Sequence, residues 1–157
     1  MAERVLITTA DLEPAVRLRD AFESEGYAVE LLTPGERIAD VPDPVLLVLS
    51  GALDQKQARR LAREAAELDR LPVLALIESP AQASEELRFR LGVSEFALKP
   101  IDPTDIALIG RRLIERQHLR AVTGIVGETD AMREALERVV QIAPVNSTVL
   151  ITGESGT

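Results

Sequence analysis

The side chains that could do chemistry lie mainly where apolar runs end. Lys99 directly follows the run EFAL at residues 95–98, and Asp11 comes soon after the run RVLIT at residues 4–8. Paired carboxylates can hold a divalent cation, and a lysine beside them can neutralise a phosphoryl group. A second place is the run GESGT at residues 153–157, whose glycines could let the backbone fold around phosphate oxygens.

Composition limits the classes of protein to which this chain can belong. It has 157 residues, of which 46% are hydrophobic and 28% charged, so we expect a globular protein that buries one proper core. The formal net charge of −8 argues against nucleic-acid binding, because phosphate contacts need clustered Lys and Arg. No apolar run approaches the roughly 20 residues of a membrane span. A cytoplasmic protein without a membrane partner is therefore expected.

Short apolar runs alternate with helical patterns over the first two thirds of the sequence. The runs cover residues 4–8, 28–32, 44–49, 72–77 and 95–98. Helical patterns lie between them at residues 11–25, 54–68 and 83–91, and glycines close the first and third. Runs of nearly continuous Val, Leu and Ile are typical of strands that are covered on both faces. The alternation predicts an α/β fold with a five-stranded, parallel, doubly wound sheet.

A longer helix is predicted from Pro103 to about Val122. Its first half can dock on the sheet, while its second half could project with apolar side chains exposed. The candidate dimer seam consists of Ile106, Ile109, Leu113 and Ile114. The alternative is a helix that only covers the sheet and continues into a polar connector.

A new unit begins at Gly124. Residues 129–142 form an amphipathic pattern with Thr129 as N-cap, and residues 149–152 (VLIT) predict a short buried strand. This strand leads into the candidate nucleotide-binding residues Gly153, Glu154, Ser155, Gly156 and Thr157. A complete phosphate loop also needs a Lys and a Ser or Thr after such glycines. On the five residues alone, an ordinary turn is the more common explanation of the pattern.

Residues 124–157 nevertheless resemble the opening of the ATPase domain in sigma-54-dependent transcription activators, the bacterial enhancer-binding proteins. The resemblance rests on the entry turn IVGET, the helix after it, and the strand VLIT that leads to GESGT. In that family the loop continues with Gly-Lys, and the lysine binds nucleotide phosphates. The resemblance implies a fragment with an incomplete Walker A loop, which is not an enzyme and holds no cofactor. ATP and magnesium are expected for the intact parent.

Members of that family often carry an N-terminal receiver domain, and residues 4–120 look like one. The five-strand pattern and the Lys99-Pro100 step match it, and Phe96 stands at the position of the family's switching aromatic residue. In a working receiver, an acidic pair after the first strand holds magnesium. An Asp ending the third strand accepts the phosphoryl group, a hydroxyl ends the fourth strand, and a lysine neutralises the charge.

Most of these positions lack the side chains that the chemistry needs. The acidic pair falls on Thr9 and Ala10, the acceptor on Val48 and the hydroxyl on Ile77, while Lys99 is kept. Asp11 lies nearby, but a role as helix N-cap is sufficient to explain it. Lys99 could pair with Asp11 or Asp102, or be solvated. The sequence predicts a degenerate phosphorylation pocket with no metal.

These inferences divide the chain into a pseudo-receiver core at residues 1–101, a last receiver helix and linker at 102–123, and a truncated ATPase piece at 124–157. The expected function is that of a regulatory domain without a phosphoacceptor Asp, which acts on the ATPase domain of its chain by protein contact or homodimerisation. Sigma-54 RNA polymerase and DNA would be reached only through missing domains. The alternatives are a small-molecule or nucleotide-binding flavodoxin-like domain, and a phosphorylated receiver with an unusual acceptor.

Overall fold

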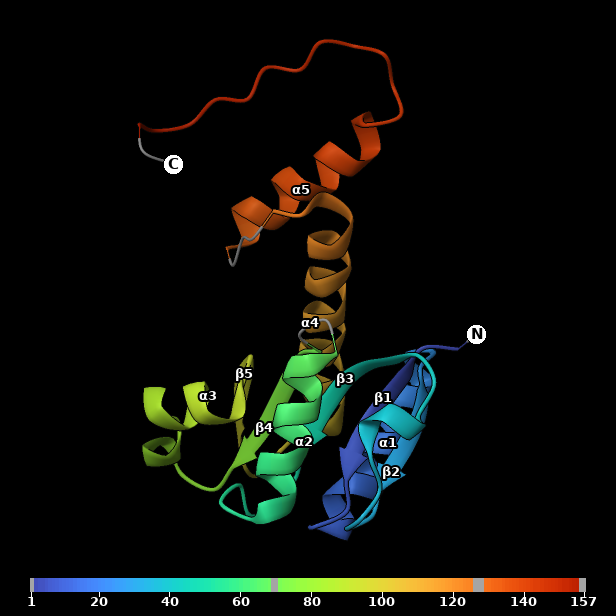
Figure 1. Cartoon of the computed structure of the whole chain (residues 1–157), viewed down its shortest axis with the longest axis vertical. Coiled ribbons are helices and arrows are strands. Elements are labelled where there is room, and N and C mark those ends of the chain that lie inside the picture. Colours follow the sequence, from blue (N-terminus) through green and yellow to red (C-terminus); the bar gives the residue numbers. More distant parts are fainter. Residues whose placement is uncertain (1, 69–70, 126–128, 156–157) are drawn as a thin grey trace. The chain divides into compact units, whose positions relative to one another are not determined.

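The computed structural model describes residues 2–68, 71–125 and 129–155 (Figure 1). The chain divides into two compact units, Met1–Gln117 and His118–Thr157. This division falls inside the long helix α4, Pro103–Thr123. Among the described residues, no helix is long and apolar enough to cross a membrane.

The first unit is built on one parallel sheet of five strands in the order β2-β1-β3-β4-β5. The strands are β1 (Arg4–Thr8), β2 (Ala28–Leu32), β3 (Pro44–Leu49), β4 (Val73–Ile77) and β5 (Glu95–Leu98). The register pairs Ile7 of β1 with Leu31 of β2 and with Val48 of β3. The prediction of a doubly wound α/β fold is confirmed.

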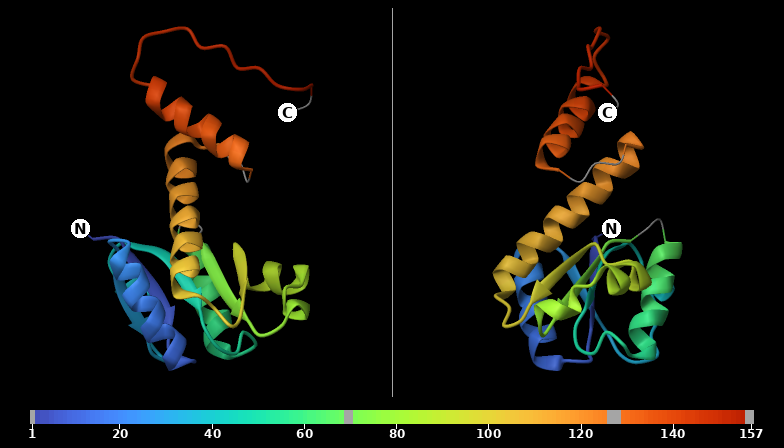
Figure 2. Two further views of the ribbon diagram at one scale, coloured as in Figure 1. Left: turned by 180° about the vertical axis from the view of Figure 1, so that it is seen from behind. Right: turned by 90° about the vertical axis from the view of Figure 1, so that its left-hand side faces the viewer.

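Helices cover both faces of this sheet (Figure 2). Helix α1 (Leu12–Ser24) and the first part of α4 lie on one face, and α2 (Lys56–Glu67) and α3 (Glu85–Leu91) lie on the other. Two short 3-10 helices, η1 (Ile38–Asp40) and η2 (Pro80–Gln82), lie in loops. The helix that was predicted from residue 54 begins at Lys56, with Gln55 rather than Asp54 at its N-cap position.

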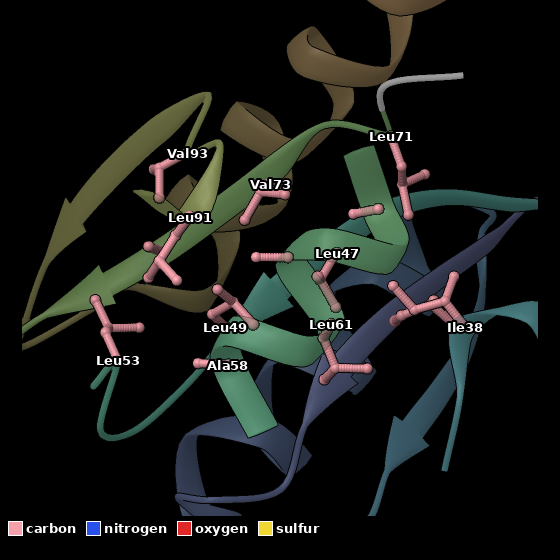
Figure 3. Close-up of a cluster of buried hydrophobic side chains, with 14 of the residues drawn as sticks. Ile38, Leu47, Leu49, Leu53, Ala58, Leu61, Leu71, Val73, Leu91 and Val93 are labelled. Carbon is pink, nitrogen blue, oxygen red and sulfur yellow. The ribbon is translucent and has the colours of Figure 1, made fainter. Parts of the chain in front are cut away.

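Two hydrophobic cores result, because alternate side chains of each strand point to opposite faces. Figure 3 shows the core beneath α2 and α3, where Leu47 and Leu49 of β3 meet Leu61 of α2 and Leu91 of α3. Val48 lies between those two β3 residues in sequence and belongs to the opposite core.

The expected dimer seam belongs to this opposite core. Ile106, Leu113 and Ile114 are only 3%, 4% and 1% exposed, and Ile109 is partly buried against the same cluster. The expectation that these side chains are free for a second copy is wrong. Their stripe covers the sheet of their own chain, so the alternative of a covering helix describes this part of α4.

Gly110 lets α4 lie unusually close to the sheet and to α1. A Cβ atom built at this position would lie 2.6 Å from Cε1 of Phe22 and 2.8 Å from Cδ2 of Leu46. Both of these side chains are fully buried, so neither can move aside into solvent. Glycine here serves close packing.

A buried polar pair joins the carboxyl ends of β1 and β3. The Thr8 hydroxyl donates to the Ser50 carbonyl at 3.0 Å and accepts from the Ser50 backbone N–H at 2.8 Å. The Ser50 hydroxyl in turn donates to the Thr8 carbonyl. Both residues are 3% exposed, so their polar groups depend on each other rather than on water.

The second unit contains helix α5 (Asp130–Ile142), as predicted. The Thr129 hydroxyl accepts from the backbone N–H of Met132 at 3.2 Å, which confirms Thr129 as the N-cap. The predicted buried strand at residues 149–152 is absent from the structure, and Leu150 and Ile151 are 85% and 87% exposed. A strand needs a neighbour for its backbone hydrogen bonds, and none of the described residues supplies one here.

Replacing Gly110 by valine should lower the free energy of unfolding by about 2 kcal/mol, because the new side chain must displace Phe22 or Leu46. Urea unfolding followed by circular dichroism measures the change. Arg112→Val introduces the same residue at an exposed position of the same helix and is the matched control. Its expected cost is below about 1 kcal/mol. Equal losses in the two variants would contradict a close-packing role for Gly110.

Replacing Thr8 by valine should destabilise the protein by about 1–3 kcal/mol, because the Ser50 backbone N–H is left buried without a partner. Thr9→Val is the control. The Thr9 hydroxyl only donates to the Leu32 carbonyl, which also accepts the Thr9 backbone N–H at 3.1 Å and keeps that bond. In thermal and urea unfolding, the Thr8→Val variant should be clearly less stable than the Thr9→Val variant. The reverse order of stability would refute this account.

Candidate functional site

A cleft of about 580 Å³ opens at the carboxyl ends of the strands. Residues that follow β1, β3 and β5 line it, together with the end of β4, the loop after it and helix α3. Open α/β sheets place their ligand and catalytic sites at this edge, because strand ends and helix starts converge there. Of the residues predicted for the phosphorylation pocket, Ala10, Asp11 and Lys99 line the cleft.

Lys99 lies between two carboxylates. Its Nζ atom is 3.0 Å from Oδ2 of Asp11 and 2.8 Å from Oε1 of Glu78, and only 14% of the Lys99 side chain is exposed. The pairing with Asp11 is one of the alternatives that the sequence left open, whereas Asp102 accepts from the Thr104 backbone N–H at 2.8 Å instead. The Asp11 side chain makes no capping hydrogen bond to α1, so its role as a helix cap is not confirmed.

The charge of Lys99 is stabilised by this arrangement. Partial burial disfavours the ammonium form, but the hydrogen bonds and charges of Glu78 and Asp11 outweigh it and raise the pKa of Lys99 above its ordinary value. The ion pairs therefore persist at neutral pH. Their contribution to stability is present below the pKa of an unfolded lysine and is lost only as the pH rises through the raised value.

Glu78 was not among the predicted site residues. Its loop is closed by Gln82, whose side-chain oxygen accepts from the backbone N–H groups of Glu78 at 2.6 Å and Ser79 at 3.3 Å. This short turn after β4 directs the Glu78 carboxylate to Lys99. The only signal in the sequence was an acidic residue directly after a buried strand.

The other predicted pocket positions do not meet in the cleft. Val48 is fully buried in the core beneath α1 and α4, and Ile77 is 3% exposed in the opposite core. The Thr9 hydroxyl donates to the Leu32 carbonyl of the neighbouring strand at 3.0 Å. Val48 precedes the last residue of β3 and points into the core, and its assignment as the acceptor position stays a prediction.

Ser50 is the residue that directly follows β3. Its hydroxyl is buried and donates to the Thr8 carbonyl, so it is not a free nucleophile. The next residue, Gly51, has a φ of +93°, and a Cβ atom there would lie 2.7 Å from Cβ of Ala10. The loops after β1 and β3 therefore meet through two small residues, Ala10 and Gly51.

The carboxylates near the cleft do not form a metal site. Among the described residues, no group of three or more His, Cys, Asp or Glu side chains could hold a metal ion. Asp11 and Glu78 contact Lys99 instead, so the arrangement is an internal salt bridge network.

Phe96 lies half-buried at the edge of the core beneath α2 and α3. The guanidinium carbon of Arg88 lies 4.9 Å from the centre of its ring, a cation–π contact. Arg88 also donates to the carbonyls of Val93 and Ser94 at 3.3 and 3.2 Å. These bonds tie α3 to β5, and a switching role for Phe96 stays a prediction.

The structure describes three of the five predicted phosphate-loop residues. Gly153, Glu154 and Ser155 are exposed and form no helix or strand, while Gly156 and Thr157 lie outside the described residues. A nucleotide-binding role for these residues stays a prediction.

No family model matches the chain. The transcriptional regulatory protein ZraR of Escherichia coli O157:H7 is 24% identical over 172 aligned positions, which cover 98% of this chain and 38% of ZraR. The Nif-specific regulatory protein of Bradyrhizobium diazoefficiens is 51% identical over 43 positions, which cover 27% of this chain and 7% of that protein. The chain thus spans well under half the length of these relatives.

Solved structures agree with the fold. NtrX from Brucella abortus in complex with ATP has a TM-score of 0.60 at 23% identity, and the match covers 99% of this chain and 38% of NtrX. A CheY-like receiver domain from Methanospirillum hungatei has a TM-score of 0.59 at 20% identity, covering 75% of this chain and 98% of the receiver. The chain is thus similar to sigma-54-dependent regulators, and its first unit has the fold of receiver domains.

Proposed function

We propose that the first unit is an atypical receiver, which regulates without accepting a phosphoryl group. The observation that carries this proposal is the engagement of Lys99 by Asp11 and Glu78 at 3.0 and 2.8 Å. A receiver lysine must be available to an incoming phosphoryl group, and here two carboxylates of the same chain already neutralise it.

The end of β3 supports the same proposal. An acyl phosphate can form only on a carboxylate, and the predicted acceptor position is Val48. Ser50, directly after β3, has a hydroxyl that is buried and hydrogen-bonded to Thr8. Asp54 follows four residues later and lines the cleft, but it makes no ion pair with Lys99, whose partners are Asp11 and Glu78. Magnesium would have to replace the lysine that Asp11 already binds.

The remaining role is regulation by protein contact. In this proposal, the first unit controls an ATPase domain of the same, longer chain, as a cytoplasmic homodimer. The intact protein uses ATP and magnesium, and reaches sigma-54 RNA polymerase and DNA through segments beyond these 157 residues. This stretch hydrolyses no ATP itself, because a phosphate loop also needs its lysine and magnesium-binding residues.

Any contact surface must differ from the seam that the sequence suggested. Because Ile106, Leu113 and Ile114 are buried, a partner has to use other side chains. Phe89 on α3 is 92% exposed, more than any other large hydrophobic side chain described in the first unit. An exposed aromatic ring of this kind is a common anchor in protein interfaces.

Incubation of the 157-residue chain with acetyl phosphate and magnesium should give no phosphorylated species in intact-mass spectrometry. The physical reason is the lack of a free carboxylate beside an available lysine. A receiver domain that autophosphorylates with the same donor serves as the positive control. A mass increase of one phosphoryl group that disappears in Asp11→Asn or Asp54→Asn would refute the proposed function.

A further inference from the structure

We propose that the cleft at the carboxyl ends of the strands binds a free α-amino acid, with Arg90 holding its carboxylate and Asp54 its ammonium group. The inference rests on the proposed function in one respect, namely that phosphoryl transfer does not use this cleft. Binding of such a ligand would then be the signal that the first unit receives.

The first observation is a pair of opposite charges that the fold leaves unused. Asp54 precedes α2, Arg90 lies in the last turn of α3, and both side chains line the cleft. Within the described residues, neither side chain makes a hydrogen bond or an ion pair, and they do not pair with each other. The two charges therefore face one cavity with their hydrogen-bonding capacity available to a ligand.

The second observation is that the other charges of the cleft are already matched. Lys99, Asp11 and Glu78 satisfy one another and do not compete for a ligand. A simple anion would find a partner only in Arg90, beside three carboxylates, and a simple cation would leave Arg90 unpaired. A zwitterion can pair with both Arg90 and Asp54. Its two charge-assisted hydrogen-bonding interactions should make it bind more tightly than an anion or a cation that can pair with only one of them.

The third observation is the shape and lining of the cleft. Leu53, Leu76 and Leu87 are 6%, 1% and 9% exposed and give it an apolar wall, and the small residues Ala10 and Gly51 also line it. Its volume of about 580 Å³ lies within the range of small-molecule sites. An α-amino acid offers two charges on one carbon and a side chain for such a wall.

A ligand bound in the cleft would connect helices α2 and α3. A molecule held by Asp54 and Arg90 joins the start of α2 to the end of α3. Helix α3 carries the exposed Phe89 and, through Arg88, contacts Phe96 of β5. Binding would favour one position of α3, which shifts the population of contact-competent states.

The test is a ¹H–¹⁵N NMR titration of the full 157-residue chain with each protein α-amino acid in turn. At least one should shift the amide signals of Gly51, Ala52 and Asp54. Two analogues of that compound, one without the amino group and one without the carboxylate, should each bind about tenfold more weakly. Failure of every amino acid to shift these signals would overturn the proposal.

Single substitutions test separately the contact of Arg90 with the ligand carboxylate and the contact of Asp54 with the ligand ammonium group. Arg90→Gln should remove the preference for the amino acid over the analogue without a carboxylate, and Asp54→Asn should remove the preference over the analogue without an amino group. Arg63→Gln and Glu86→Gln are matched controls, because both positions are exposed and outside the cleft. Unchanged affinity in both cleft variants would also overturn the proposal.

The phosphodonor experiment on the same sample keeps the two proposals apart. Phosphorylation with no amino-acid binding would refute both. The absence of phosphorylation together with the absence of binding would refute only the ligand site and leave the atypical receiver standing.

Discussion

The ammonium group of Lys99 is held between the carboxylates of Asp11 and Glu78, and the chemistry of the whole sheet edge depends on that contact. An incoming phosphoryl group or metal ion would have to break one or two charge-assisted hydrogen bonds at a largely buried lysine. Nothing at the end of β3 compensates for that loss, because Ser50 donates its hydroxyl to Thr8. The lysine therefore joins the loops after β1, β4 and β5.

The sheet explains why these groups meet at all. Its central strands β1, β3 and β4 are largely buried on both faces, so charged side chains can emerge from them only at the strand ends. The Thr8–Ser50 pair fixes the ends of β1 and β3, and Gly110 lets α4 pack closely against Leu46 of β3. Packing at some distance from the cleft thus determines where its side chains lie.

The fold was predictable because nearly continuous runs of Val, Leu and Ile are typical of buried strands. Lys99 directly follows one of these strands, and Asp11 comes soon after another. Other features had no such signal. The run PVLLVL does not show that the residue after it, Ser50, buries its hydroxyl against Thr8. The stripe through Leu113 looks the same for a covering helix and a dimer seam. The apolar segment at residues 149–152 has strand composition, but strand formation depends on a neighbour that composition cannot reveal.

A receiver that accepts no phosphoryl group, as proposed for the first unit, can still signal, since the parts that connect the cleft to the surface are present. Gln82 shapes the turn that presents Glu78, and the helix that begins soon after this turn carries both Arg90 in the cleft and Phe89 on the surface. Arg88 links the same helix to Phe96 of β5. A ligand that alters the charge balance in the cleft therefore acts on one short helix with an exposed aromatic ring. A signal can pass through that helix by non-covalent contacts alone.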